Sequence, residues 1–288
     1  MPFFRVYTLP KFHEEETLKK LSIPRIVSLA ALAAVCSCAP GDGGEPVSLK
    51  PQEPMADDAS VIYLHHSTGG GVWGGGVSDW FTAYNAAQGK NYLIEERAYP
   101  DGNNYPWDNY PYDYWNIWIN HEGATAYSGQ DTLEILTAEY DVIMWKHCYP
   151  VSDIGADTGS PNVSSAAKTI ENYKLQYNAL KTKMKSFPNN RFVVWTGAAR
   201  IAGETNAESA ARSRAFFTWV KDDWDETGDN IYIWDFYELE TEGTNYLQYS
   251  GGDSHPSDDF NEDVAPLVSR RIVDVLEGRG DIGSLTGE

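Results

Sequence analysis

Cysteine and basic residues are both scarce in this chain. Only three cysteines occur among 288 residues, and two of them, Cys36 and Cys38, lie close together near the N-terminus. The rest of the chain keeps Cys148 alone, which excludes a disulfide framework. Lysine and arginine number 22 against 42 aspartates and glutamates, a formal net charge of −20. A surface of that charge repels phosphate backbones, so we expect no nucleic-acid partner.

Long apolar runs are missing as well. The one extended run, Ile26 to Val35, is too short to span a bilayer. Hydrophobic residues nevertheless make up 42% of the chain and aromatic residues 13%, far more than a disordered chain contains. The composition excludes a polytopic membrane protein and a disordered scaffold, and it predicts a folded domain with a buried core.

The first 37 residues have the pattern of a secretory signal peptide. Lys19, Lys20 and Arg25 precede the apolar run, and a small residue stands directly before Cys38. This ending resembles the lipid-attachment motif of bacterial lipoproteins. The resemblance implies export and a lipid anchor on Cys38, which would be the protein's only connection to a membrane.

Two further features concern the same region. The acidic residues at 14–16 do not suit a signal peptide, whereas a start at Leu18 would give an ordinary basic N-terminus. Residues 38–59 are rich in proline and glycine and are expected to form a flexible tether. An ordinary signal peptide with incidental cysteines is the alternative.

The body of the chain, residues 60–288, alternates predicted strands and helices. Strands are expected at 60–65, 91–98, 141–146, 191–196 and 230–235. Helical spacing occurs at 77–87, 131–140, 164–186, 207–224 and 264–276. Strands separated by helices form parallel sheets that are covered on both faces. We therefore predict a single α/β domain, a three-layer α/β/α sandwich with a mainly parallel sheet of about five strands and flavodoxin-like topology. Its site should lie at the carboxyl ends of the strands.

Two segments supply the residue types of a hydroxyl nucleophile and its base. Ser67 follows the first predicted strand, where its hydroxyl would lie beside free backbone N–H groups. Asp253 and His255 occupy the loop before the last helix, and a catalytic base needs such a carboxylate to orient it. Together these segments resemble the SGNH/GDSL hydrolase superfamily. The resemblance implies that Ser67 is the nucleophile, His255 the base and Asp253 its orienting partner.

The chain departs from that family at three points. His65-His66-Ser67-Thr68 stands in place of the Gly-Asp-Ser-Leu block. Asp253 precedes His255 by two positions, whereas the family has an Asp-x-x-His spacing. The Gly-x-Asn-Asp block, whose asparagine serves the oxyanion hole, is missing after the third strand. A divergent branch, or one that has lost activity, would show such departures.

Other residues must then donate to the oxyanion. Lys146, His147 and Asn103 are the candidates, and Lys146 is favoured because charge-assisted hydrogen bonds are stronger. Strand alternation should send Lys146 and His147 to opposite faces of the sheet. Cys148 could act as a thiol nucleophile, but a lone cysteine at a strand end is interpreted as packing.

Aromatic residues are concentrated between positions 99 and 118, interleaved with aspartates. Aromatic faces stack on sugar rings, and nearby carboxylates accept hydrogen bonds from sugar hydroxyls. The candidate substrate-binding residues are His66, Tyr105, Trp107, Tyr112 and Trp115. A long loop that packs its own core is the alternative interpretation.

The sequence thus predicts a monomeric serine ester hydrolase without cofactor or metal. It would remove acyl groups, such as acetyl, from an extracellular polysaccharide through an acyl-Ser67 intermediate. A glycan-binding lipoprotein without activity on the same fold is the second hypothesis. An NAD-dependent oxidoreductase is the third, because residues 69–74 match G-x-G-x-x-G with Glu95 downstream. The histidines at 65, 66, 147 and 255 could form a metal site, although no metal-binding spacing supports this.

Overall fold

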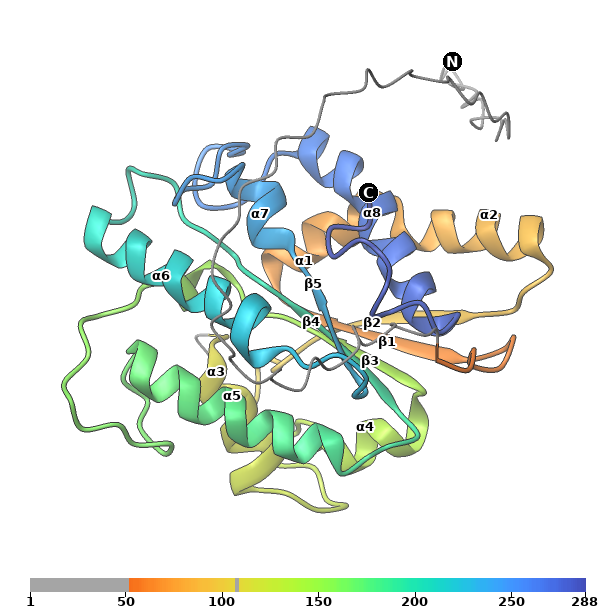
Figure 1. Cartoon of the computed structure of the whole chain (residues 1–288), viewed down its shortest axis with the longest axis horizontal. Helices are drawn as coiled ribbons and strands as arrows, with labels where there is room; N and C mark the ends of the chain where they lie inside the picture. Colours follow the sequence, from red (N-terminus) through yellow and green to blue (C-terminus); the bar gives the residue numbers. More distant parts are fainter. Residues whose placement is uncertain (1–51, 107–108) are drawn as a thin grey trace, which may run out of the picture. The chain divides into compact units, whose positions relative to one another are not determined.

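The computed structural model describes residues 52–106 and 109–288 (Figure 1). At its centre lies a five-stranded sheet in the order β2-β1-β3-β4-β5. All neighbouring strands pair in parallel. The strands are β1 (Ser60–His65), β2 (Leu93–Ala98), β3 (Val142–Trp145), β4 (Arg191–Trp195) and β5 (Ile231–Trp234). The five predicted strands and their parallel arrangement are confirmed.

Helices cover both faces of this sheet (Figure 1). The α-helices are α1 (Ser67–Val72), α2 (Ser78–Gln88), α3 (Pro111–Trp115), α4 (Leu133–Glu139), α5 (Ile170–Lys185), α6 (Ala207–Trp219), α7 (Phe236–Thr241) and α8 (Asp258–Leu276). Short 3-10 or π segments are η1 (Trp73–Val77), η2 (Asn116–Asn120), η3 (Tyr149–Ser152) and η4 (Val220–Trp224). The three-layer α/β/α architecture predicted from the sequence is confirmed.

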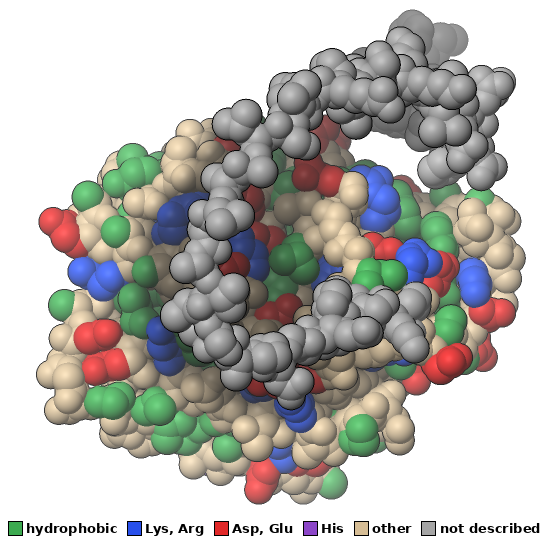
Figure 2. Space-filling view, viewed as in Figure 1, with side chains coloured by type: hydrophobic (Ala, Val, Ile, Leu, Met, Phe, Trp, Pro, Cys, Tyr) green, Lys and Arg blue, Asp and Glu red, His purple; other side chains and the backbone are tan. Residues whose placement is uncertain are grey.

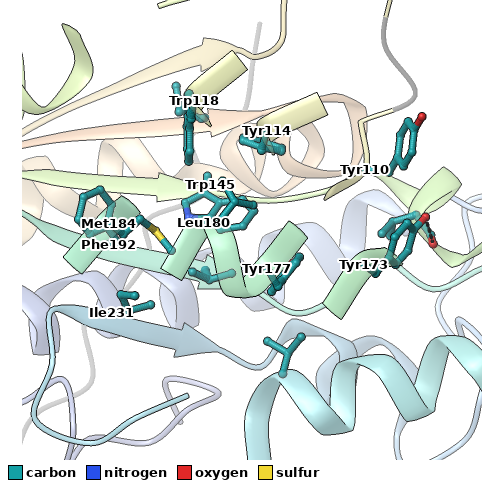
Figure 3. Packing of buried hydrophobic residues seen from close by; sticks show 14 of the residues in the cluster. Tyr110, Tyr114, Trp118, Trp145, Tyr173, Tyr177, Leu180, Met184, Phe192 and Ile231 are labelled. Carbon is teal, nitrogen blue, oxygen red and sulfur yellow. Dashed lines mark hydrogen bonds between the residues drawn. The ribbon is translucent and has the colours of Figure 1, made fainter. Parts of the chain in front are cut away.

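Strand alternation divides the core into two halves. Along β3, Ile143 and Trp145 face the half that contains α3, α4, α5 and α6, while Val142 and Met144 face α1, α2 and α8. The first half is rich in aromatic rings, with Tyr114, Trp118, Trp145 and Tyr177 packed together (Figure 3). Because both faces are buried, the central strands are apolar throughout.

The glycine-rich segment after β1 is helical. The segment forms α1 and η1, and η1 continues into α2 through a kink at Gly76, whose φ of 117° suits glycine. A Cβ at Gly75 would lie 2.3 Å from the backbone oxygen of Asn261 in α8, and one at Gly69 would lie 2.5 Å from Cβ of His65. These glycines allow close helix packing, and they do not form the open phosphate-binding turn of the oxidoreductase hypothesis.

The described part of the chain begins within the segment predicted to be a tether. The backbone N–H of Gln52 donates to Gly278, and that of Met55 donates to Leu276 at the end of α8. Residues 52–59 thus contact the domain. The predicted signal peptide and the lipid-attachment residue Cys38 lie outside the described residues. Within residues 52–106 and 109–288, no helix is long and apolar enough to cross a membrane.

The last helix begins six residues earlier than predicted. Ser257 caps α8 by accepting a hydrogen bond from the Phe260 N–H at 3.3 Å, and Asp258 and Asp259 occupy its first turn. Carboxylates in that position interact favourably with the helix dipole. The acidic run therefore belongs to the helix, and the 253–255 loop leads directly into it.

Candidate active site

Ser67 lies at the junction between β1 and α1. It follows His66, which has extended backbone angles, and it is the first residue of α1. The Ser67 side chain is exposed, whereas Thr68 directly after it is buried. His65 is fixed by a hydrogen bond from Nε2 to Glu96 Oε2 on β2, at 2.5 Å. The hydroxyl therefore stands at the carboxyl edge of the sheet on a rigid element.

Cys148 lies directly beneath Ser67, three residues after the end of β3. Its thiol is 2.9 Å from Ser67 Oγ and 3.4 Å from Thr68 Oγ1. The Cys148 residue is 1% exposed, whereas Ser67 is exposed to solvent. The Cys148 N–H donates to the carbonyl of Asn109 at 3.3 Å. This contact ties the end of β3 to the loop before α3.

The third segment of the candidate site, after those of Ser67 and Cys148, is the loop 253–255 before α8. Asp253 Oδ1 accepts hydrogen bonds from the His255 backbone N–H and from its Nδ1, each at 2.9 Å. The loop is also closed by the Gly251 N–H, which donates to the His255 carbonyl at 2.8 Å. Asp253 thus stabilises the turn and orients the imidazole at the same time. The two-residue spacing between Asp253 and His255, which departs from the family pattern, permits this contact.

His255 connects this loop to Cys148. The Tyr149 ring packs edge-on against the imidazole, with centroids 5.0 Å apart and planes at 90°. A hydrogen bond to Cys148, opposed by partial burial and assisted by Asp253, raises the pKa of His255 to about 9. Burial would raise the pKa of Cys148. Lys146 and hydrogen bonds from His255, Ser67 and the Thr68 backbone outweigh it and lower that pKa to about 5. The two pKa shifts have the directions expected of a thiolate beside an imidazolium.

Lys146 is buried under the first turn of α1. Its Nζ donates to the His66 carbonyl at 3.4 Å and lies 5.4 Å from the centre of the Trp195 ring. Burial lowers its pKa to about 8, against the opposing charges of Cys148 and Glu240. Its ammonium therefore binds a backbone oxygen and acts on Cys148 through its charge. A hydrogen bond from Lys146 to a substrate oxyanion stays a prediction.

The other two oxyanion candidates lie elsewhere. His147 is fully buried in the aromatic half of the core, where its Nε2 is 2.9 Å from Tyr177 Oη. Lys146 and His147 thus lie on opposite faces, as alternation predicts. Asn103 is exposed in the loop after β2 and donates to Asp101 Oδ1 at 2.7 Å. His147 therefore packs in the core away from Ser67, and the Asn103 side chain is hydrogen-bonded within its own loop.

Two of the expected substrate-binding residues line a pocket, and the other described ones do not. A pocket of about 360 Å³ is lined by Tyr105, Pro106, Tyr110, Tyr112, Asp113, Asn116, Tyr127 and Ser128. Trp115 is buried and packs against Tyr112 with ring centroids 5.8 Å apart. The half-buried His66 contacts the Pro100 carbonyl through Nε2, and Trp107 lies outside the described residues. Tyr105 and Tyr112 are thus the predicted residues that form a concave surface.

The sequence interpretation gave no functional role to Cys148 or to two residues that contact it, Thr68 and Asn109. Cys148 itself was assigned to packing, and Thr68 and Asn109 carried no recognisable motif. Asn109 is fully buried with a positive φ of 51°, and its Nδ2 donates to the Tyr99 carbonyl at 3.1 Å. In the sequence, only the position of Asn109 in a loop near the strand ends could have indicated a role at the site. In the part of the chain that the structure describes, no group of three or more His, Cys, Asp or Glu residues could hold a metal.

The visible face of the domain mixes both signs of charge (Figure 2). Carboxylates lie between lysines and arginines on this face, and the basic side chains form no continuous patch there. Several cations are paired, as Lys183 is with Glu122 at 2.6 Å. This distribution gives no support to a phosphate-backbone ligand on that face.

No protein-family model and no curated protein sequence matches the chain. The solved structures that are similar to it at low identity include the following three. One is an acetyl xylan esterase, at 14% identity and a TM-score of 0.41, covering 72% of this chain and 95% of the other. A gut microbial diltiazem-metabolizing enzyme has 12% identity and a TM-score of 0.46, and the match covers 82% of this chain but half of that one. The lipopolysaccharide acetyltransferase periplasmic domain of Salmonella ser. Paratyphi A has 13% identity and a TM-score of 0.38, covering 72% and 81%. These values assign neither a family nor an activity.

Proposed function

We propose that this protein hydrolyses acyl esters through a covalent acyl-enzyme. The observation that carries the proposal is the cluster of Ser67, Cys148, Asp253 and His255. These residues come from three segments that are far apart in the sequence, and hydrogen bonds join them at the carboxyl edge of a parallel sheet. A hydroxyl nucleophile and a carboxylate-oriented imidazole are the groups that nucleophilic catalysis requires, and here the Cys148 thiol lies between them.

Each member of the cluster has a distinct role in this proposal. Ser67 is the nucleophile, because it is the exposed hydroxyl of the cluster. His255, oriented by Asp253, manages the proton that leaves Ser67 and returns it to the departing alcohol. The Ser67 backbone N–H would help to stabilise the oxyanion. This membership of the SGNH type and its serine chemistry are proposed on geometry alone.

A covalent label tests the nucleophile directly. We expect the protein to release nitrophenol from 4-nitrophenyl acetate and to gain one acetyl group on the peptide that contains Ser67, measured by mass spectrometry after acid quench. Ser67→Ala should lose the adduct while keeping the melting temperature of the wild type. Absence of both turnover and adduct in the wild type would favour the alternative, a glycan-binding protein without activity on this fold.

The tyrosine-lined pocket supports a carbohydrate as the carrier of the acyl group. It combines four aromatic rings with the polar side chains of Asp113 and Asn116, a mixture suited to sugar rings and hydroxyls. Its Tyr110 directly follows Asn109, whose carbonyl binds the Cys148 N–H. The pocket and the cluster are therefore held by the same loop. An acetylated extracellular polysaccharide is the substrate class we propose.

Removing one ring should affect binding of a large substrate only. Tyr112→Ala is expected to raise KM for an acetylated oligosaccharide by about 10-fold, since aromatic contacts contribute on the order of 1 kcal/mol beyond their buried area. The kcat/KM for 4-nitrophenyl acetate should stay within about twofold, because that ester carries no sugar for the pocket to bind. If Tyr112→Ala weakened the reaction of both substrates equally, the pocket would not be the binding site for the sugar.

A further inference from the structure

The sulfur of Cys148 stands between the proposed nucleophile and the proposed base. Ser67 Oγ contacts Cys148 Sγ at 2.9 Å, and the hydrogen bond of His255 on that side is also made with Cys148. Because Nδ1 of His255 is engaged by Asp253, Nε2 is the ring nitrogen left for the sulfur. In the part of the chain that the structure describes, no hydrogen bond joins Ser67 to His255 directly. The order of contacts is Ser67, Cys148, His255 and Asp253.

The surroundings of the sulfur are those of a proton acceptor. Ser67 Oγ, Thr68 Oγ1, the Thr68 backbone N–H and the His255 ring all make hydrogen bonds with it. The buried ammonium of Lys146 lies close enough to act on it by charge. A neutral thiol is a weak acceptor and needs no such set of donors, whereas a thiolate does. A cysteine that only filled space would have apolar neighbours.

Exposure separates the roles of oxygen and sulfur. Cys148 is 1% exposed and lies under Ser67, whose side chain is open to solvent. The Ser67 oxygen is therefore accessible from solvent, whereas the Cys148 sulfur is buried in this conformation. The thiol is therefore placed to exchange a proton with Ser67 and not to carry the acyl group.

We infer that Cys148 is a proton relay, through which the Ser67 hydroxyl passes its proton to the His255–Asp253 pair. The inference rests on the proposed ester hydrolysis and specifies how its nucleophile is activated. It differs from a direct serine–histidine–aspartate triad in having one more group, and hence two moving protons.

The proton balance closes over one turnover. As the Ser67 Oγ–carbon bond forms, the Oγ–H bond breaks and its proton moves to Sγ. The imidazolium of His255 protonates the alcohol oxygen as the ester bond breaks, and the S–H proton then passes to the ring. The thiolate–imidazolium pair is restored. Water repeats the sequence in deacylation: its proton enters at sulfur, and Ser67 receives one as the acid leaves.

Matched substitutions at position 148 test the relay in the whole protein with 4-nitrophenyl acetate. Cys148→Ala removes the relay and should lower kcat by about 10²–10⁴-fold, the usual contribution of general acid–base catalysis. Cys148→Ser keeps a group that can accept and donate a proton and should restore at least a tenth of the wild-type kcat. Melting temperatures within a few degrees of the wild type would show that both variants fold.

The pH profile supplies a readout that packing alone would not change. In the wild type, the acid limb should lie near pH 5, where the thiolate–imidazolium pair forms. In Cys148→Ser the limb should move up by more than about one pH unit, toward the ordinary histidine range. The other titratable groups around the sulfur are His66, Lys146, Tyr149 and Glu240, and both variants retain them.

Three other outcomes would overturn the relay. Wild-type kcat and pH profile in Cys148→Ala would assign the thiol to packing. An acetyl group found on Cys148, with Ser67→Ala active and Cys148→Ser inactive, would make the thiol the nucleophile while ester hydrolysis still stands. A wild type without any turnover would overturn the proposed function and the relay together. Should Cys148→Ala not fold, a proton inventory of wild-type kcat in H₂O–D₂O mixtures decides: curvature supports two moving protons, and a straight line opposes them.

Discussion

Replacing His255 with alanine is expected to lower kcat/KM for 4-nitrophenyl acetate by about 10³–10⁴-fold. The imidazole holds the second proton of the cluster, and its removal leaves the buried Cys148 sulfur without its hydrogen-bonded counter-ion. His255 is half-buried and covered on one side by Tyr149, so its loss should change the melting temperature little. Initial rates at pH 7.5, with circular dichroism of the same samples, measure both effects.

Asp253 should matter less than the histidine it orients. Its carboxylate is more than half exposed, and water screens its charge. Asp253→Asn is therefore expected to cost about 10–10² in kcat/KM, mainly through ring orientation. Asp258→Asn, an exposed acid at the start of α8, is the matched control and should leave the rate unchanged. Equal losses at 253 and 258 would contradict a specific role for Asp253.

The sheet could be predicted because its strands carry a strong local signal. Segments such as 60–65 and 141–146 are short, apolar and separated by helical spacing, which leaves a parallel sheet covered on both faces as the only economical arrangement. The same logic directs attention to the strand ends. Ser67, Cys148 and the 253–255 loop do lie together there, although their catalytic roles stay predictions.

What the sequence could not supply was the choice among neighbouring side chains. Lys146, His147 and Cys148 follow one strand, and only packing decides which of them faces Ser67. The aromatic core takes His147, the first turn of α1 covers Lys146, and Cys148 remains against the hydroxyl. Alternation predicts opposite faces for Lys146 and His147, but it does not predict which side chain lies against Ser67, because β3 has already ended at Trp145.

The structure of the glycine run at 69–76 could not be predicted from the sequence for a related reason. Glycine is common in phosphate-binding turns and in close helix contacts, and the local sequence does not distinguish them. The distinction depends on Asn261, nearly two hundred positions away, whose backbone needs the space beside Gly75. Long-range contacts of this kind also explain why α1 was not expected within so many glycines.

A second large effect is expected on the stability of the fold, from the ionisation of Asp225. Asp225 follows η4, and its Oδ1 is buried with no hydrogen-bond partner among the described residues. Burial, with the nearby charge of Asp229, raises its pKa from 3.8 to about 7, against the opposing charge of Arg271. Between about pH 4 and pH 7, Asp225 is therefore protonated in the folded protein and ionised in the unfolded chain.

The sign of the resulting pH dependence follows from that difference. A raised carboxyl pKa makes stability fall as pH rises from about 4 to about 7, after which the loss is constant. Three pKa units at about 1.4 kcal/mol each correspond to a loss of about 4 kcal/mol above pH 7. Asp225→Asn removes the ionisation while keeping the shape of the side chain, so it should recover most of this loss.

We expect Asp225→Asn to raise the free energy of unfolding by about 3–4 kcal/mol at pH 8 and by less than about 1 kcal/mol at pH 4. For a domain of this size the gain at pH 8 corresponds to roughly 6–12 °C in melting temperature. Asp222→Asn, an exposed acid in η4, is the control and should shift neither value by more than about 0.5 kcal/mol. Urea unfolding at both pH values measures the difference. An equal gain at pH 4 and pH 8 would show that the asparagine stabilises by packing, because only a buried ionisation makes the gain depend on pH.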